Sequence, residues 1–297
     1  MTKTSIDYLT HTWNPLAMRC TKVSPACDHC WHLAMANRLA ANPTMSDRAR
    51  AAYRGETGPM LIDSRLGDPL KHKKPAVIGV QFMGDLFHDD VPLGFLELIF
   101  DVIEKTPQHI YQILTKRTKN MHDHFADLAY HCGETCASAF PNVWLGVTVE
   151  NQDTADGRRA DLEATPAAVK FVSYEPALGL IDWTGWEFVD QIISGGETGP
   201  RARPSPRNAH RSTRDFCQAN DIAYFFKQHG EWLHFERRAK SSGGYYHADN
   251  GKRLLVEKFI DKPHEVHGDF GIARVGNKAA GHLLDGREWR EMPGGER

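Results

Sequence analysis

Long apolar runs are absent from this sequence of 297 residues. No stretch of about 18 apolar residues occurs, so we expect no membrane-spanning helix. The first eight residues also lack the apolar core of a secretory signal, and we therefore expect a cytoplasmic protein. A strong net charge is absent as well, because 36 Lys and Arg residues stand against 38 Asp and Glu residues. The whole-chain charge therefore gives no sign of nucleic-acid binding, although it is compatible with a local basic groove.

Cysteine is scarce, with six residues in the chain, which is too few for a disulfide scaffold. Three of the six nevertheless lie within eleven residues as C-x6-C-x2-C, at Cys20, Cys27 and Cys30. The last two are one turn apart, so their sulfur atoms can meet at one centre, and Pro25 shapes the longer gap. Clustered thiolates of this kind indicate a metal or iron–sulfur site.

The number of cysteines decides what such a site does. Four protein ligands close a structural zinc site, whereas three leave one coordination position open for chemistry. We therefore favour a reactive centre on three cysteines. A structural zinc site remains the alternative, with a nearby histidine as its fourth ligand: His11, His29 or His32.

Strand-like and helix-like segments alternate along most of the chain, at intervals of roughly 20–33 residues. Such alternation predicts an α/β fold with a parallel sheet. We expect a partial or irregular (β/α) TIM-like barrel of about six to seven parallel strands over residues 1–232, with a helical excursion at 31–75. Residues 233–297 are Gly-rich and polar, and we expect them to form a C-terminal appendage packed on the barrel. The predicted strands are 6–14, 76–82, 109–114, 142–149, 169–173, 189–194 and 222–226.

Helices are predicted between these strands from their apolar faces and their capping residues. Asp90 followed by Pro92 predicts a helix start before residues 93–105. Asn151 is the expected cap of a helix that runs to residue 163. The remaining predicted helices are 31–41, one that ends at about residue 129, and 209–220.

Ionisable residues follow the predicted strands at their carboxyl ends. In a barrel of parallel strands these ends share one face, where active sites lie. This placement indicates an enzyme site, although Glu150 and Glu197 would also fit as acidic residues at helix starts. The residues at these strand ends are Asp85, Lys116, Arg117, Glu150, Glu175 and Glu197.

Motifs spread over nearly the whole chain are shared with a known family. Beside the cysteine motif they include Thr-Trp-Asn-Pro at 12–15, Met-Gly-Asp-Leu-Phe-His at 83–88, Gln-Ile-Leu-Thr-Lys-Arg at 112–117, Trp-Leu-Gly-Val-Thr-Val-Glu-Asn at 144–151, Phe-Val-Ser-Tyr-Glu-Pro at 171–176, Gly-Gly-Glu-Thr-Gly at 195–199, Phe-Phe-Lys-Gln at 225–228 and the stretch 278–289. The chain resembles the phage-associated three-cysteine-motif proteins, a family of unknown function. That family is similar in layout to radical S-adenosylmethionine enzymes.

The resemblance implies cofactors and roles for particular residues. Cys20, Cys27 and Cys30 would hold a [4Fe–4S] cluster, and its open iron would bind S-adenosylmethionine, which an electron donor then helps to cleave to a radical. The commonest spacing in that superfamily is C-x3-C-x2-C, whereas the first gap in this chain is six residues. By the same resemblance, Gly84 and Asp85 would contact the cofactor. From their positions after the predicted strands, we expect further cofactor contacts from Arg117, Glu150 and Glu197, and we expect Lys116 and Glu175 to be catalytic.

Three functions remain open from the residues. The first is an iron–sulfur enzyme of the radical S-adenosylmethionine type, acting on a nucleic acid or a nucleotide. The second is a zinc or cluster protein that binds nucleic acid without turnover, through the basic run 71–74 and the arginines Arg201, Arg203, Arg207 and Arg211. The third is a divalent-metal hydrolase that uses the carboxylates Asp85, Glu150, Glu175 and Glu197.

Overall fold

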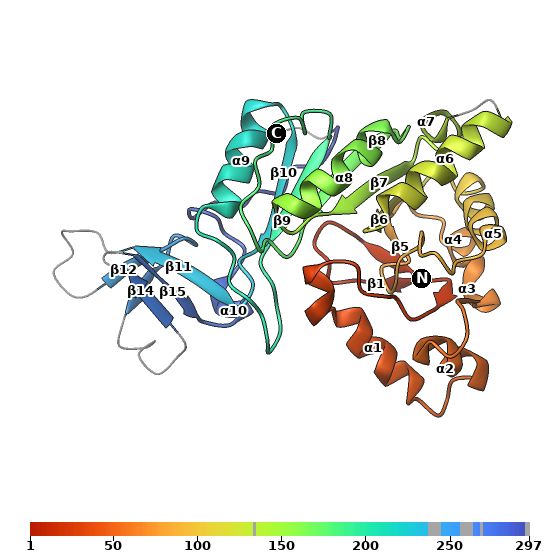
Figure 1. The fold of residues 1–297 in the computed structure, drawn as a ribbon, viewed down its shortest axis with the longest axis horizontal. Helices are drawn as coiled ribbons and strands as arrows, with labels where there is room; N and C mark the ends of the chain where they lie inside the picture. Colours follow the sequence, from red (N-terminus) through yellow and green to blue (C-terminus); the bar gives the residue numbers. More distant parts are fainter. Residues whose placement is uncertain (133–134, 237–244, 256–263, 268–269, 295–297) are drawn as a thin grey trace. The chain divides into compact units, whose positions relative to one another are not determined.

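We describe a computed structural model of the chain (Figure 1). Its helices and strands agree with most of the segments expected from the sequence. The described residues are 1–132, 135–236, 245–255, 264–267 and 270–294. Within these ranges, no helix is both long and apolar enough to cross a membrane.

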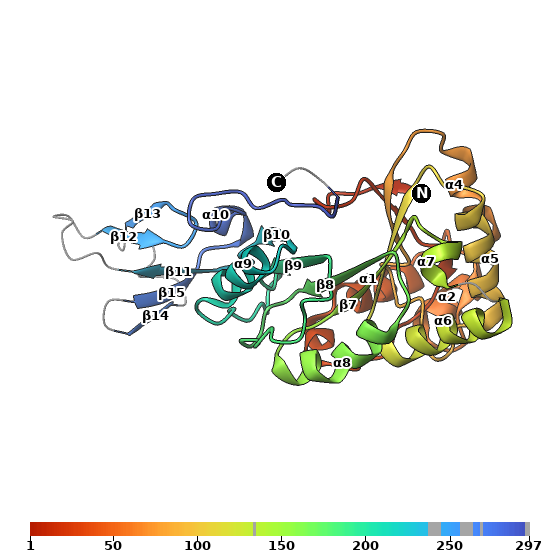
Figure 2. The ribbon, with the colours of Figure 1, turned by 90° about the horizontal axis from the view of Figure 1, so that it is seen from above.

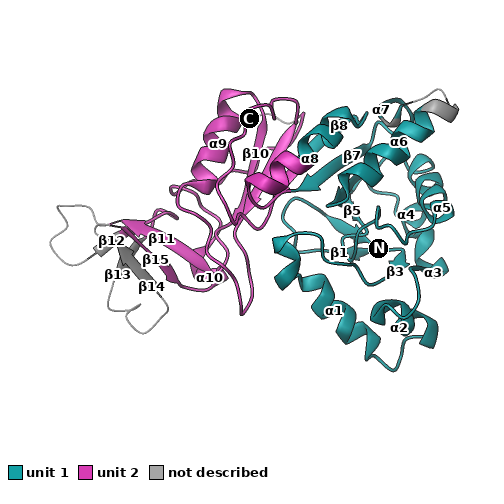
Figure 3. Cartoon of the chain, in the orientation of Figure 1, with its two compact units in different colours: residues 1–148, 158–171 teal, residues 149–157, 172–297 magenta. Residues whose placement is uncertain are grey.

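Two compact units make up the chain (Figure 3). The first unit consists of Met1–Thr148 and Arg158–Phe171, and the second of Val149–Gly157 and Val172–Arg297. The boundary expected at residue 232 stays a prediction.

The fold is mixed α/β, with a mostly parallel main sheet as expected. Its strand order is β1-β2-β5-β6-β7-β8-β9-β10, and the described strands leave it open, with β1 and β10 as its edges. β1 is antiparallel to β2, whereas the pairs β2–β5, β5–β6, β6–β7 and β9–β10 are parallel. The strands are β1 (Thr2–Lys3), β2 (His11–Trp13), β5 (Val77–Val80), β6 (Ile110–Thr115), β7 (Val143–Thr148), β8 (Val169–Tyr174), β9 (Gln191–Gly195) and β10 (Ala223–Gln228).

The burial of these strands explains their composition. Every residue of β7 and of β9 is buried. Continuous apolar runs of this kind are typical of parallel strands that are covered on both faces. Gly146 of β7 has a specific reason to be glycine, because a Cβ there would lie 2.4 Å from the ring of Phe171.

The first unit contains the helices expected at 31–41, at 93–105 and before about residue 129, and several more. The prediction at 31–41 is confirmed by α1, which packs beside α2 (Figure 1). The prediction that Asp90 caps the next long helix is wrong, because Pro92 occupies that position without a side-chain cap. The elements are α1 (Trp31–Ala40), α2 (Asp47–Arg54), α3 (Asp63–Leu66), α4 (Asp68–Lys71), α5 (Leu93–Glu104), α6 (Thr118–Cys132) and α7 (Cys136–Ala139), with the short strands β3 (Leu16–Ala17) and β4 (Met60–Leu61).

Two further helices follow the predicted pattern closely. α8 (Gln152–Ala164) begins after Asn151, and the side-chain oxygen of Asn151 accepts the N–H of Thr154 at 3.1 Å, as expected for its cap. α9 (Ala209–Ala219) occupies the expected range before β10.

The second unit contains an antiparallel sheet that we did not predict. Five strands in the order β13-β12-β11-β15-β14 form it, with α10 (Asn277–Ala280) against β11 (Figure 2). A small apolar core holds it together, made of Leu233, Phe235, Ala248, Ala273, Val275 and Ala280. The strands are β11 (Trp232–Glu236), β12 (Tyr245–Ala248), β13 (Arg253–Leu255), β14 (His264–His267) and β15 (Phe270–Arg274).

Candidate functional site

The cysteine loop, residues 19–31, lies in the first unit between β3 and α1. A 3-10 turn, Pro25–His29, contains Cys27 and leads directly to Cys30, and proline suits its first position because the φ of proline is already fixed. The N–H of Cys27 donates to the carbonyl of Ser24 at 2.9 Å. Cys27 is buried, whereas Cys20 and Cys30 are partly exposed, and all three thiols are free.

Arg117 fastens the cysteine loop to the sheet. It follows β6, and its guanidinium donates from Nη2 to Oγ1 of Thr21 at 2.6 Å and from Nη1 to Oδ2 of Asp85 at 3.0 Å. Nη1 also lies 3.8 Å from the sulfur of Cys20. Arg117 is 8% exposed, so these contacts are shielded from water. A rigid guanidinium fork suits one side chain that must hold two groups at once.

Asp85 is the partner that keeps Arg117 in place. Its Oδ1 accepts the N–H of Phe87 at 3.1 Å and the hydroxyl of Thr115 at 2.7 Å. Its Oδ2 accepts the N–H of Lys116 at 3.2 Å, together with the bond from Arg117. An ionised carboxylate has about four acceptor positions, and four protein donors occupy those of Asp85. This carboxylate therefore joins the turn after β5 to the turn after β6.

His88 supports the loop from the same turn. Its Nε2 lies 2.9 Å from the Thr21 hydroxyl, and its Nδ1 accepts the N–H of Asp90 at 3.1 Å. Nε2 also accepts the backbone N–H of Thr21 at 3.3 Å. Thr21, which we did not single out from the sequence, is thus held by both His88 and Arg117 directly after the first cysteine.

Gly84 makes the turn after β5 possible. Its φ of +144° is a conformation that other residues rarely adopt, and a Cβ there would lie 2.5 Å from the sulfur of Met18. Met18 is buried two residues before Cys20. The glycine therefore lets the turn approach the chain that leads into the cysteine loop.

The electrostatics of the loop are set by burial and by two charges. Burial raises the pKa of the Cys20 thiol to about 11; the carboxylate of Asp85 adds to the increase, and Arg117 opposes it. Burial alone would lower the pKa of Arg117, but the charge of Asp85 raises it. A metal that binds the Cys20 sulfur would therefore release a proton from it.

The donor set of the loop fits an iron–sulfur cluster in its chemistry. Three thiols are available on one short loop, and the Cys27 thiol is near enough to influence the pKa of Cys20. Across the described residues, no three His, Cys, Asp or Glu side chains already stand in positions that would hold a metal ion. Ligation would thus require the thiols to turn toward a common centre.

In the second unit, two of the three predicted site residues, Glu175 and Glu197, form separate ion pairs. Oε2 of Glu175 lies 2.6 Å from Nζ of Lys227. Glu197 accepts three hydrogen bonds from Arg203, including one of 2.6 Å from Nη2. Glu150 is fully buried at the end of β7.

Comparison with known proteins identifies the family but no function. A family model described as "Protein of unknown function (DUF5131)" matches residues 3–293. The chain belongs to this family. Neither the curated proteins nor the solved structures contain a match.

In this DUF5131 chain, the structure gathers part of the site that we predicted. Cys20, Asp85, Arg117 and the backbone of Lys116 come together in the first unit. Thr21 was not predicted as a site residue. Its position directly after the predicted ligand Cys20 was the only sequence feature that pointed to it.

Proposed function

We propose that this DUF5131 chain is an iron–sulfur enzyme that resembles radical S-adenosylmethionine enzymes. Cys20, Cys27 and Cys30 would hold a [4Fe–4S] cluster. The observation that carries the proposal is the double attachment of Arg117 to Thr21 and Asp85, which ties the cysteine loop to the ends of β5 and β6. A loop that served only as a surface connection would not need a buried ion pair to position it.

Each residue of the attachment has a separate task in this proposal. A cluster with one iron free of cysteine would supply an electron and an open coordination position. Arg117, beside the Cys20 sulfur, would offset part of the negative charge of the ligated thiolates. Asp85 holds Arg117 and is therefore a positioning residue, since its own oxygens are already occupied by protein donors.

The finer parts of the proposal rest on the resemblance. They are the use of S-adenosylmethionine, a nucleic acid or nucleotide as substrate, and the cofactor contact from Gly84. The proposed partial barrel and cytoplasmic location rest on the sequence pattern. The cofactor contacts from Arg117, Glu150 and Glu197 and catalysis by Lys116 and Glu175 rest on the positions of these residues after strands.

The two other functions receive less support from the contacts. A nucleic-acid surface needs cations that are free for phosphates. Three of the four candidate arginines, however, are paired with carboxylates: Arg203, Arg207 and Arg211. A divalent-metal hydrolase needs free carboxylates, but Glu175 and Glu197 are paired with cations, and Asp85 accepts four hydrogen bonds.

Anaerobic reconstitution with iron and sulfide tests the cluster. We expect a visible absorbance, about four iron atoms per chain, and loss of both in the triple variant Cys20→Ala/Cys27→Ala/Cys30→Ala. Cys217→Ala, which removes a thiol outside the loop, is the control and should keep the cluster. The cluster proposal fails if the triple variant binds as much iron and sulfide as the natural chain.

A second measurement separates the cofactor from the cluster. The reconstituted protein is reduced in the presence of S-adenosylmethionine, and 5′-deoxyadenosine is measured. Formation of this nucleoside is the expected result. A complete cluster without any cleavage of S-adenosylmethionine would contradict this part of the proposal and leave the cluster in place.

A further inference from the structure

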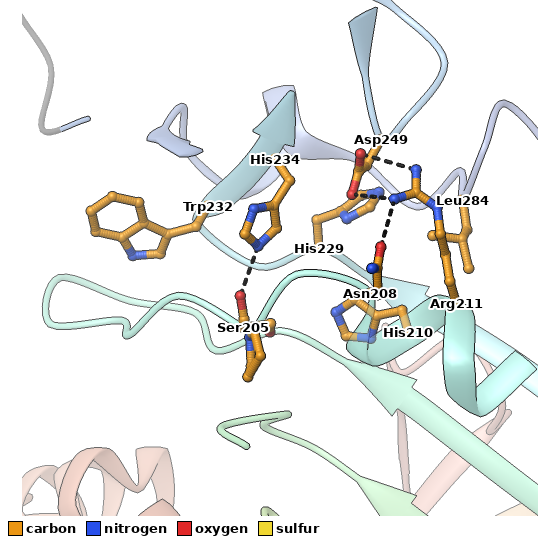
Figure 4. A pocket seen from close by; sticks show the side chains of 10 residues that line it. Ser205, Asn208, His210, Arg211, His229, Trp232, His234, Asp249 and Leu284 are labelled. Carbon is orange, nitrogen blue, oxygen red and sulfur yellow. Dashed lines mark hydrogen bonds and ion pairs between the residues drawn. The ribbon is translucent and has the colours of Figure 1, made fainter. Parts of the chain in front are cut away.

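A small cavity in the second unit is surrounded by three histidines (Figure 4). Its volume is about 10 Å³, which is room for roughly one water molecule or one ion. His210 comes from α9, His229 follows β10, and His234 belongs to β11. The residues come from three different elements, and the fold brings them to the same space.

Two of these imidazoles are fixed in one tautomer by backbone carbonyls. Nε2 of His229 lies 2.8 Å from the carbonyl oxygen of Leu283, and Nε2 of His234 lies 2.8 Å from that of Ser205. A carbonyl oxygen only accepts, so both Nε2 atoms carry the proton. Nδ1 of each ring is therefore left with its lone pair.

His210 presents a buried nitrogen that lacks a partner among the described residues. Its Nδ1 lies 2.6 Å from Oγ of Ser194, whereas its Nε2 is buried and makes no hydrogen bond. The hydroxyl of Tyr224 donates to the carbonyl of His210 at 2.9 Å, which holds the backbone of this residue. When Nδ1 of His210 donates to Oγ of Ser194, Nε2 keeps its lone pair.

The charges around the cavity favour a cation over an anion. Burial lowers the pKa of His210 well below its ordinary value and that of His229 to about 4, so both rings are neutral at pH 7. The guanidinium of Arg211, which lines the cavity, is paired with Asp249 at 3.0 Å and with Asp285 at 2.6 Å. The cavity thus offers neutral lone pairs, and the positive charge of Arg211 is already balanced.

We infer that this cavity binds one divalent transition-metal ion of the zinc class, through Nε2 of His210 and Nδ1 of His229 and His234. Neutral imidazoles are common ligands of such ions, and metal-binding histidines usually donate their other ring N–H to a carbonyl or a similar group. All three rings have such a second partner.

Binding would require a small inward movement of the rings. The ring centres of His210 and His229 are 6.1 Å apart. Two imidazoles on one tetrahedral zinc ion, with Zn–N distances of about 2 Å, have centres roughly 5 Å apart. For this pair the movement would be roughly 1 Å, and His234 would also have to approach, since no metal-ligand set is already assembled in the described residues.

Cobalt and zinc titrations of the full-length chain test the inference. The triple variant Cys20→Ala/Cys27→Ala/Cys30→Ala removes binding by the cysteine loop, so the test is independent of the proposed cluster. We expect this chain to bind one Co²⁺, with a ligand-field absorption free of thiolate charge transfer, and Zn²⁺ to displace it. His234→Gln and His210→Gln should each weaken binding at least tenfold, whereas His282→Gln, at an exposed histidine, should leave it unchanged.

A second measurement avoids any change at the cavity. Nitrogen NMR of the imidazoles in the triple cysteine variant should show Zn²⁺-dependent shifts of Nδ1 in His229 and His234. A cavity that holds only water would show no such shifts and no bound cobalt, and this result would overturn the inference. Equal affinity in the His234→Gln and His282→Gln variants would overturn it as well.

Discussion

The cysteine loop and the histidine cavity both gather side chains of types that can bind metals, but they are held in place differently. The three thiols are close in sequence, and contacts from outside the loop, chiefly Arg117, hold them as a group. The three imidazoles come from separate elements, and each has a support of its own. One lost contact should therefore disturb the whole loop, whereas in the cavity it should disturb one ligand.

The largest effect is expected from Arg117→Ala. This change leaves the buried carboxylate of Asp85 without its cation, and breaking a buried ion pair costs about 3–5 kcal/mol. We expect a lower free energy of unfolding in denaturant titrations and a strong loss of bound iron after reconstitution. Arg117→Lys keeps the charge and should fall between Arg117→Ala and the natural chain. Full iron content in Arg117→Ala would show that the loop does not depend on this anchor.

A smaller effect is expected from Ser194→Ala in the cavity. The change leaves Nδ1 of His210 buried without a partner, which costs about 1–3 kcal/mol. Stability should fall by this amount while the iron content of the cysteine loop stays unchanged. Ser212→Ala, at an exposed position of α9, is the control and should be near neutral. Loss of the cluster in Ser194→Ala would contradict the separation of the two sites.

Acid should lower the stability of the fold through His124. This imidazole of α6 packs on Phe87, Phe100 and Phe125, with ring centres 5.0–5.9 Å apart. Burial lowers its pKa, and the charge of Asp127 partly opposes this. The unfolded chain, with a histidine pKa near 6.5, therefore binds the proton first, so stability falls as the pH drops below about 6.5.

The variant His124→Leu should remove this part of the pH dependence. Denaturant midpoints at pH 7, 6 and 5 should fall less steeply in the variant than in the natural chain. Parallel curves for the two proteins would show that His124 does not contribute.

The smallest effect is expected from Lys22→Ala. Nζ of Lys22 lies 3.2 Å from Oδ1 of Asp28, but both side chains are more than half exposed. Exposed pairs of this kind contribute about 0–1 kcal/mol. Iron content and stability should stay close to those of the natural chain, and a large loss would show that the loop is also held from within.

Much of the parallel part of the fold could be predicted from the sequence. Strands such as 142–149 are continuous apolar runs, and their position between helical patterns admits few other structures. The placement of Asp85 and Arg117 near the cysteine loop also followed from the rule that strand ends of a parallel sheet meet. The sequence did not reveal how Asp85 is used, because two of its four hydrogen bonds come from backbone N–H groups that the fold positions.

The antiparallel sheet of the second unit escaped prediction for a physical reason. Its strands are short, and in β11 buried residues alternate with partly exposed ones. Such strands carry a weak signal when turns and glycines surround them. The histidine cavity was missed with them, since His210, His229 and His234 meet only once α9, β10 and β11 are in place.

The bond between Thr21 and Arg117 joins residues 96 positions apart in the chain. The cysteine loop is therefore synthesised long before the residue that fastens it. On a ribosome, the loop would lack this attachment until β6 and Arg117 have emerged and paired with the earlier strands. In a zinc finger, the metal drives folding. In this protein the sheet must assemble first, because Arg117 can hold the cysteine loop in position only after β6 has paired.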